Sequence, residues 1–184
     1  MPSTKHLEFK MVGGSELRIT AFHEAGHCVG AVIMGLRFLS LGVTIAWGDD
    51  QEDSGNTFAV RPRGGTESDI LKDLTYLLCG GVAERILAAD DKHRVPGADA
   101  DINEAEKVLS SVVDEIRNAE LRRRSYEQAN TLLRENWAAV EAIASELIKH
   151  RSLRPDRIKA IVNQHGPKRR AATRTKARGK RRTC

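Results

Sequence analysis

Two histidines one helical turn apart are the residues with the clearest capacity for chemistry. His23 and His27 flank a glutamate in the run His23-Glu24-Ala25-Gly26-His27. If this run is helical, the two imidazoles lie on the same face and can bind one tetrahedral zinc ion. Glu24 lies about 100° around the helix from His23, so its carboxylate can act as general base on a zinc-bound water. Because zinc lowers the pKa of that water to about 7, the pattern predicts metal-dependent hydrolysis.

Chance and core packing are the competing interpretations of this run. A chain of this composition would contain HExxH by chance roughly 0.015 times. Histidines that only satisfy core hydrogen bonds fit poorly on a helix of small side chains with a glutamate between them. Metal binding is therefore the favoured interpretation.

A catalytic zinc ion needs a third protein ligand and an open fourth position. No HExxHxxGxxH extension follows His27, so the ligand must come from further along the chain. His93 lies in a polar segment and is expected to face solvent, and Asp99 is better used as a helix N-cap. Asp101 and Glu104 both remain, because spacing alone does not choose between them.

The elements that must position these residues are mainly helical. We expect a helix from Ser15 to about Met34, ended by Gly35. The alternation of Leu39, Leu41, Val43 and Ile45 predicts a strand, and 57–60 a second strand that forms a hairpin or small sheet with it. Further helices are expected over about 66–88, with a Thr66/Asp69 capping box, from Asp99 to about Ile116, over 119–149 and over 155–164. The predicted fold class is mainly α (α+β), with about five helices and a small β-hairpin or sheet.

Charge divides the chain into a body and a tail. The net charge is +5, but residues 166–184 hold nine Lys or Arg residues and no acid, which leaves −4 for residues 1–165. We expect a flexible leader over 1–14, a single domain over 15–165 and a disordered basic tail over 166–184. Three widely spaced cysteines predict no disulfide framework, and no signal or membrane-spanning pattern is evident, so a cytoplasmic location without membrane contact is expected. Cys28 and Cys79 are expected to be small packing residues.

Four segments in order resemble the peptidase domain of FtsH-type, membrane-bound AAA+ zinc proteases. Residues 20–27 resemble that family's AxHEAGHA motif, and 43–45 with 55–57 resemble its strand pair around LGYT. Residues 77–84 resemble its LLGGRAAEE segment, and 97–105 its GASNDLxxAT segment. The resemblance covers about residues 15–164, and the combination of HEAGH with GAxxDxxxA in this order is specific.

The resemblance implies a zinc metalloendopeptidase with Zn²⁺ held by His23, His27 and Asp101 and with Glu24 as the catalytic base. It selects Asp101 over Glu104, because the family's third ligand is the aspartate of the last motif. Glu84 corresponds to a family glutamate, for which two roles are open: holding a ligand histidine's other ring nitrogen, or an ordinary salt bridge.

The chain also departs from the family. The membrane segments and the ATPase module of the family have no counterpart in these 184 residues, and no GxxxxGK[ST] phosphate loop occurs. The family has Arg and Glu where this chain has Gly81 and Arg85, and the acidic segment 49–53 resembles an insertion. The expected substrate is a peptide or unfolded protein, which the strand 57–60 could hold by edge pairing. A separate ATPase partner, nucleic-acid binding through the tail, a catalytically silent peptide-binding or adaptor module, and the oligomeric state remain open.

Overall fold

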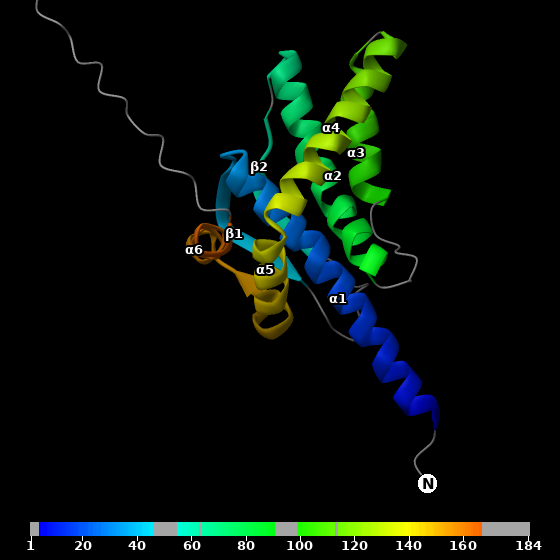
Figure 1. Cartoon of the computed structure of the whole chain (residues 1–184), viewed down its shortest axis with the longest axis vertical. Coiled ribbons are helices and arrows are strands. Elements are labelled where there is room, and N and C mark those ends of the chain that lie inside the picture. The colour runs from blue at the N-terminus through cyan, green and yellow to red at the C-terminus, as the bar shows by residue number, and fades with distance from the viewer. Residues whose placement is uncertain (1–3, 46–54, 63, 91–98, 113, 167–184) are drawn as a thin grey trace, which may run out of the picture.

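The structure is a computed structural model that describes residues 4–45, 55–62, 64–90, 99–112 and 114–166. These residues form six helices and one small sheet, which confirms the predicted mainly α (α+β) fold (Figure 1). The acidic segment 49–53, His93 and the tail after Gly166 lie outside the described residues. In chain order the elements are α1 Thr4–Ile33, β1 Arg37–Ile45, β2 Gly55–Val60, α2 Glu67–Asp90, α3 Asp99–Ser110, α4 Glu115–Glu135, α5 Trp137–His150, β3 Ser152–Leu153 and α6 Pro155–His165.

The C-terminal part of helix α1 lies between the α2–α4 group and the sheet, and its N-terminal part extends beyond the other elements (Figure 1). It begins at Thr4, so the predicted start at Ser15 is wrong. Gly13 and Gly14 each disfavour a helix by about 1 kcal/mol relative to alanine, which by itself does not end a helix of 30 residues. Its central face is built of small residues, and a Cβ on Gly26 would lie 2.5 Å from the Cys79 carbonyl oxygen. Because Cys79 belongs to α2, the backbones of α1 and α2 pack close together at this point.

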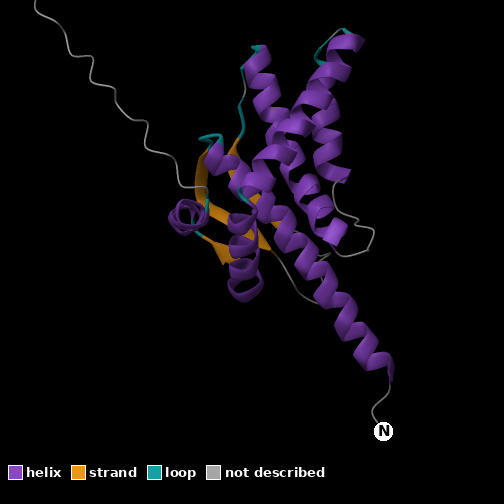
Figure 2. Cartoon of the chain, in the orientation of Figure 1, coloured by secondary structure: helices purple, strands orange, loops and turns teal. Residues whose placement is uncertain are grey.

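The sheet contains the predicted hairpin and one strand that the sequence did not indicate. Figure 2 shows the sheet as a small group of strands beside the helices. Its strand order is β2-β1-β3, and both pairs are antiparallel. Between Phe38 and Val43 the β1–β2 register shifts, and Gly42 has φ +72°. Because of this bulge Leu39 and Leu41 are exposed, which corrects the simple alternation expected of β1.

Helix α2 follows its prediction. Thr66 Oγ1 accepts a hydrogen bond from the Asp69 backbone N–H at 3.2 Å, which is half of the expected capping box, and it donates to the Asp69 carboxylate. The helix then continues through Gly80 and Gly81 to Asp90. Helix α3 begins at Asp99, so Asp101 lies in its first turn as predicted.

The single long helix expected over 119–149 is wrong, because the segment is two helices. Helix α4 ends at Glu135, and α5 begins at Trp137. Asn136 separates them with φ −117° and ψ 20°, and its side-chain amide donates to the Leu132 carbonyl at 2.8 Å. This side-chain bond competes with regular helix geometry, and the turn lets Trp137 pack on Phe22 at a ring-centroid distance of 5.7 Å.

Two apolar clusters hold these elements together. The larger joins α1, the sheet, α2, α4, α5 and α6, and it includes Cys28 and Cys79, both fully buried as predicted. The smaller fastens α3 to α2 and α4, and its buried members are Leu71, Leu74, Leu77, Ala105, Leu109 and Leu121. Among the helices of the described ranges, none has an apolar stretch long enough to cross a membrane.

Candidate metal centre

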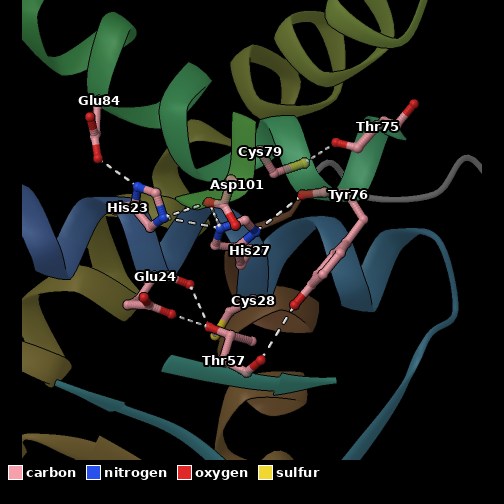
Figure 3. A network of polar contacts seen from close by, with 10 residues as sticks. All are labelled: His23, Glu24, His27, Cys28, Thr57, Thr75, Tyr76, Cys79, Glu84 and Asp101. Carbon is pink, nitrogen blue, oxygen red and sulfur yellow. Dashed lines mark hydrogen bonds and ion pairs between the residues drawn. The ribbon is translucent and has the colours of Figure 1, made fainter. Parts of the chain in front are cut away.

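Two helices bring three ligand-type side chains together. His23 and His27 project from one face of α1, and Asp101 reaches them from the first turn of α3, 74 residues beyond His27 (Figure 3). Asp101 Oδ2 lies 2.9 Å from each of the two Nε2 atoms. The two Nε2 atoms are 3.1 Å apart. The three residues predicted as metal ligands therefore form one cluster.

The dimensions of this triangle match a metal site. Ligands at about 2.0–2.1 Å from a tetrahedral zinc ion are separated by about 3.3 Å, close to the distances between these donor atoms. Gly80 of α2 closes one side of the cluster. A Cβ there would lie 2.5 Å from both Nε2 atoms, so only glycine leaves the space that the imidazoles occupy.

Each imidazole is oriented through its other ring nitrogen. His23 Nδ1 donates to Glu84 Oε1 at 2.5 Å, and His27 Nδ1 donates to the Tyr76 carbonyl at 3.1 Å. In the neutral rings these bonds place the proton on Nδ1, so that the lone pair of each Nε2 atom is available to a cation. Glu84 is only 3% exposed, so of its two proposed roles the structure has the histidine contact, not a surface salt bridge.

Glu24 lies beside the cluster and is held by strand β2. Its Oε2 accepts a hydrogen bond of 2.6 Å from Thr57 Oγ1 (Figure 3). The carboxylate also packs directly against Gly55, where a Cβ would collide with it. Glu24 is 4% exposed. Glu24 lies beside the two ligand-type histidines but is not part of the group that could hold a metal ion, which is the arrangement expected of a base rather than of a ligand.

The electrostatics of the cluster favour a bound positive charge. Burial lowers the pKa of His23, but its hydrogen bonds to Asp101 and Glu84 outweigh burial and raise the pKa to about 10. Burial raises the pKa of Asp101, yet the two histidines hold that pKa below its usual range. The proton on His23 is what a metal cation would replace, because ligation requires neutral imidazole.

Burial also raises the pKa of Glu24, although the two histidines and Thr57 oppose this effect. A carboxylate with a pKa raised toward neutrality is a better proton acceptor than an exposed one. The environment of Glu24 is therefore the one that general-base chemistry needs.

The structure separates the two carboxylates that spacing had left open. Glu104 does not belong to the cluster with the two histidines and instead pairs with Arg61 at 3.2 Å and Lys107 at 2.5 Å. Asp99 begins α3, and its side chain lies outside the described residues. Sequence reasoning missed Thr57 and Tyr76 as partners of the site, since neither a hydroxyl on a strand nor a backbone carbonyl has a pattern of its own.

No protein-family model matches the chain, and no curated protein sequence is significantly similar to it.

Proposed function

We propose that this chain is a zinc-dependent metalloendopeptidase, with His23, His27 and Asp101 as metal ligands. The observation that carries the proposal is the convergence of two imidazole Nε2 atoms and one carboxylate oxygen within 3.1 Å of one another, beside the buried Glu24. Such a donor set suits Zn²⁺, and the resemblance to FtsH-type peptidases supports the same choice. Ferrous iron also accepts two histidines and a carboxylate, so metal analysis is part of the test.

The chain's own residues divide the work of hydrolysis. A bound zinc ion supplies Lewis-acid polarisation of a carbonyl group and lowers the pKa of water. Glu24 accepts the proton of the attacking water and is the group placed to return it to the leaving amine. Thr57 holds the Glu24 carboxylate, while Glu84 and the Tyr76 carbonyl keep the histidines aligned.

An extended peptide fits the same arrangement. Strand β2 lies at the edge of the sheet in the order β2-β1-β3, and its residue Thr57 contacts Glu24. A substrate strand added to this edge would run past the catalytic carboxylate, with main-chain hydrogen bonds providing affinity. Peptides or unfolded proteins are therefore the proposed substrates.

The proposal is tested by metal content and by one substitution. Elemental analysis of the purified protein should find about one zinc per chain, and an anomalous scattering peak should lie among the three ligands. Glu24→Gln should retain the metal and lower hydrolysis of unfolded casein at least about 100-fold. Glu16→Gln, an exposed position on the same helix, is the control and should leave activity unchanged. Cleavage by Glu24→Gln at the wild-type rate would remove Glu24 from the mechanism.

A catalytically silent peptide-binding or adaptor module is the alternative. It predicts zinc binding and retention of a labelled peptide library with no cleavage products at any pH or temperature tried. The burial of Glu24 beside the cluster disfavours it, because metal binding alone does not require this carboxylate. A separate ATPase partner stays a proposal that rests on the sequence alone. The same holds for nucleic-acid binding through the tail, which lies outside the described residues.

A further inference from the structure

Arg61, the first residue after β2, links the end of that strand to α2 and α3. Its guanidinium forms a two-pronged contact with Asp73 of α2, with Nε–Oδ1 at 2.7 Å and Nη2–Oδ2 at 2.8 Å. Its remaining nitrogen, Nη1, donates to Glu104 of α3 at 3.2 Å. Glu104 lies one helical turn after Asp101, so the ion pair lies next to the third ligand along α3.

We propose that Arg61 is a positioning residue that sets metal affinity by fixing the first turn of α3, and with it Asp101, through Glu104. The proposal rests on the proposed metal site but assigns a residue outside it. Arg61 contacts neither the ligands nor Glu24, and its whole effect is transmitted through α3.

Apolar packing leaves the first turn of α3 without an anchor of its own. The buried contacts of the helix with α2 are made by Ala105 and Leu109, in its second and third turns. Ile102, the apolar residue of the first turn, is 42% exposed. Apolar contacts are also non-directional, so they tolerate small rotations of the helix. Apart from the contacts of Asp101 itself with the two histidines, the Glu104–Arg61 pair is the directional contact to another element that lies nearest to Asp101 among those described for α3.

Small rotations matter because metal ligands have narrow tolerances. A side chain about 5–6 Å from the helix axis moves about 1 Å when the helix turns by 10°. Ligand distances in a working metal site hold within about 0.2 Å. A link that limits rotation of α3 therefore changes how well Asp101 meets the two histidines.

Arg61 is itself fixed well enough to act as an anchor. Asp73 is 7% exposed, and the planar guanidinium matches its carboxylate with two parallel hydrogen bonds. Lysine offers a point charge and could not hold Asp73 in this way while reaching Glu104. The anchor thus belongs to β2 and α2, which also supply Thr57, Gly80 and Tyr76 to the site.

Glu104→Ala is the decisive variant, because it breaks the link to α3 and leaves the Arg61–Asp73 pair intact. Glu104 also pairs with Lys107 of its own helix, so Lys107→Ala removes that pair alone and is the matched control. Arg122→Ala is a second control that breaks another ion pair of α3, the exposed one between Glu106 and α4. Zinc affinity of each purified full-length variant is measured by competition with a chromogenic chelator, after thermal unfolding of the chelator-treated proteins confirms equal folding.

We expect Glu104→Ala to bind zinc roughly tenfold more weakly than wild type, the lower end of the loss that follows removal of a direct hydrogen-bond partner of a metal ligand. Lys107→Ala and Arg122→Ala should bind within about twofold of wild type. Equal affinities for Glu104→Ala and Lys107→Ala would overturn the positioning role while leaving the proposed function intact. A wild-type protein that binds no zinc would overturn both, so the two failures are distinguishable.

Discussion

Gly80 shows how much of the candidate metal centre depends on a missing side chain. Its hydrogen occupies the side of the cluster where a Cβ would lie 2.5 Å from both His23 Nε2 and His27 Nε2. The rings cannot move away freely, because Glu84 and the Tyr76 carbonyl hold their other nitrogens. Glycine at position 80 costs about 1 kcal/mol of helix stability relative to alanine, and this cost is offset because it allows α2 to approach the two imidazoles closely.

Gly80→Ala should therefore weaken zinc binding by at least about tenfold, because the methyl group displaces one or both imidazoles from their ligand positions. Chelator competition measures the affinity, and thermal unfolding checks that the protein still folds. Gly65→Ala is the matched control, since a Cβ at Gly65 meets nothing within 4 Å. Wild-type affinity in Gly80→Ala would show that the rings accommodate the methyl group and that the close contact has no part in binding.

Thr57 is expected to have a different role, because it contacts the proposed base, Glu24, and not the proposed ligands. Thr57→Val keeps the shape of the side chain but removes the donor to Glu24 Oε2. Hydrolysis of casein should fall about tenfold or more, while zinc affinity stays within about twofold of wild type. Thr57→Ser keeps the hydroxyl group and should retain most of the activity. A parallel loss of metal and activity in Thr57→Val would contradict this division of roles.

The residues of the site were predictable to different degrees. His23, Glu24 and His27 follow from local spacing on one helix, which sequence alone reveals. The choice between Asp101 and Glu104 needs the contact between α1 and α3, and spacing carries no information on it. Only the resemblance favoured Asp101. In the structure the other candidate, Glu104, forms an ion pair with Arg61 instead.

At the scale of elements, the pairing of α1 with α2 decides where the two proposed histidine ligands lie. Gly26 allows the two helix backbones to approach, because a Cβ there would lie 2.5 Å from the Cys79 carbonyl oxygen and 2.8 Å from Ala83 Cβ. The same approach brings His27 to the Tyr76 carbonyl and Gly80 to the imidazoles. A backbone carbonyl cannot rotate out of the way as a side chain can.

Gly26→Ala should lower the free energy of unfolding by about 1–3 kcal/mol, despite the better helix propensity of alanine, because the core is overpacked. Urea denaturation followed by circular dichroism measures the change, with an unchanged m-value showing that the two states compared remain the same. A gain in stability instead would mean that α1 and α2 separate at little cost and that the glycine is not needed for packing.

Elements were predictable where one local pattern governed them and not where two competed. The segment 119–149 has a continuous apolar stripe, which predicts one helix. The helix is interrupted at Asn136, whose side chain donates to the Leu132 carbonyl, and the packing of Trp137 on Phe22 also favours the break. The alternation in β1 is broken by the bulge that ends at Gly42. Strand β3 has only two residues, Ser152 and Leu153, which is too short for any periodicity to reveal.

For the whole molecule, the candidate metal centre bridges two apolar clusters. Its histidines project from a helix in the larger cluster, whereas Asp101 belongs to α3, whose buried residues all lie in the smaller one. A metal ion held by all three ligands would tie these clusters together. Metal binding is therefore expected to stabilise the fold and, above all, the docking of α3.

Removing the metal tests this coupling. If zinc binds only the folded state and its free concentration is 100-fold above the dissociation constant, it raises the free energy of unfolding by about 2.7 kcal/mol. For a domain of this size that corresponds to a rise in unfolding temperature of roughly 5–10 °C, which chelation should reverse. His23→Ala should abolish the shift, and His150→Ala, an exposed histidine at the end of α5, should retain it.

Chelation should not unfold the protein outright. The protonated His23 and the Asp101 carboxylate attract one another, so their pairing replaces part of the lost metal contacts. Hydrogen exchange should then be fastest to increase in the first turn of α3, where apolar anchoring is weakest, and least changed in the centre of α1. If zinc binds tightly but the exchange rates in α3 are the same with and without it, the metal does not join the two clusters and α3 docks independently of the metal.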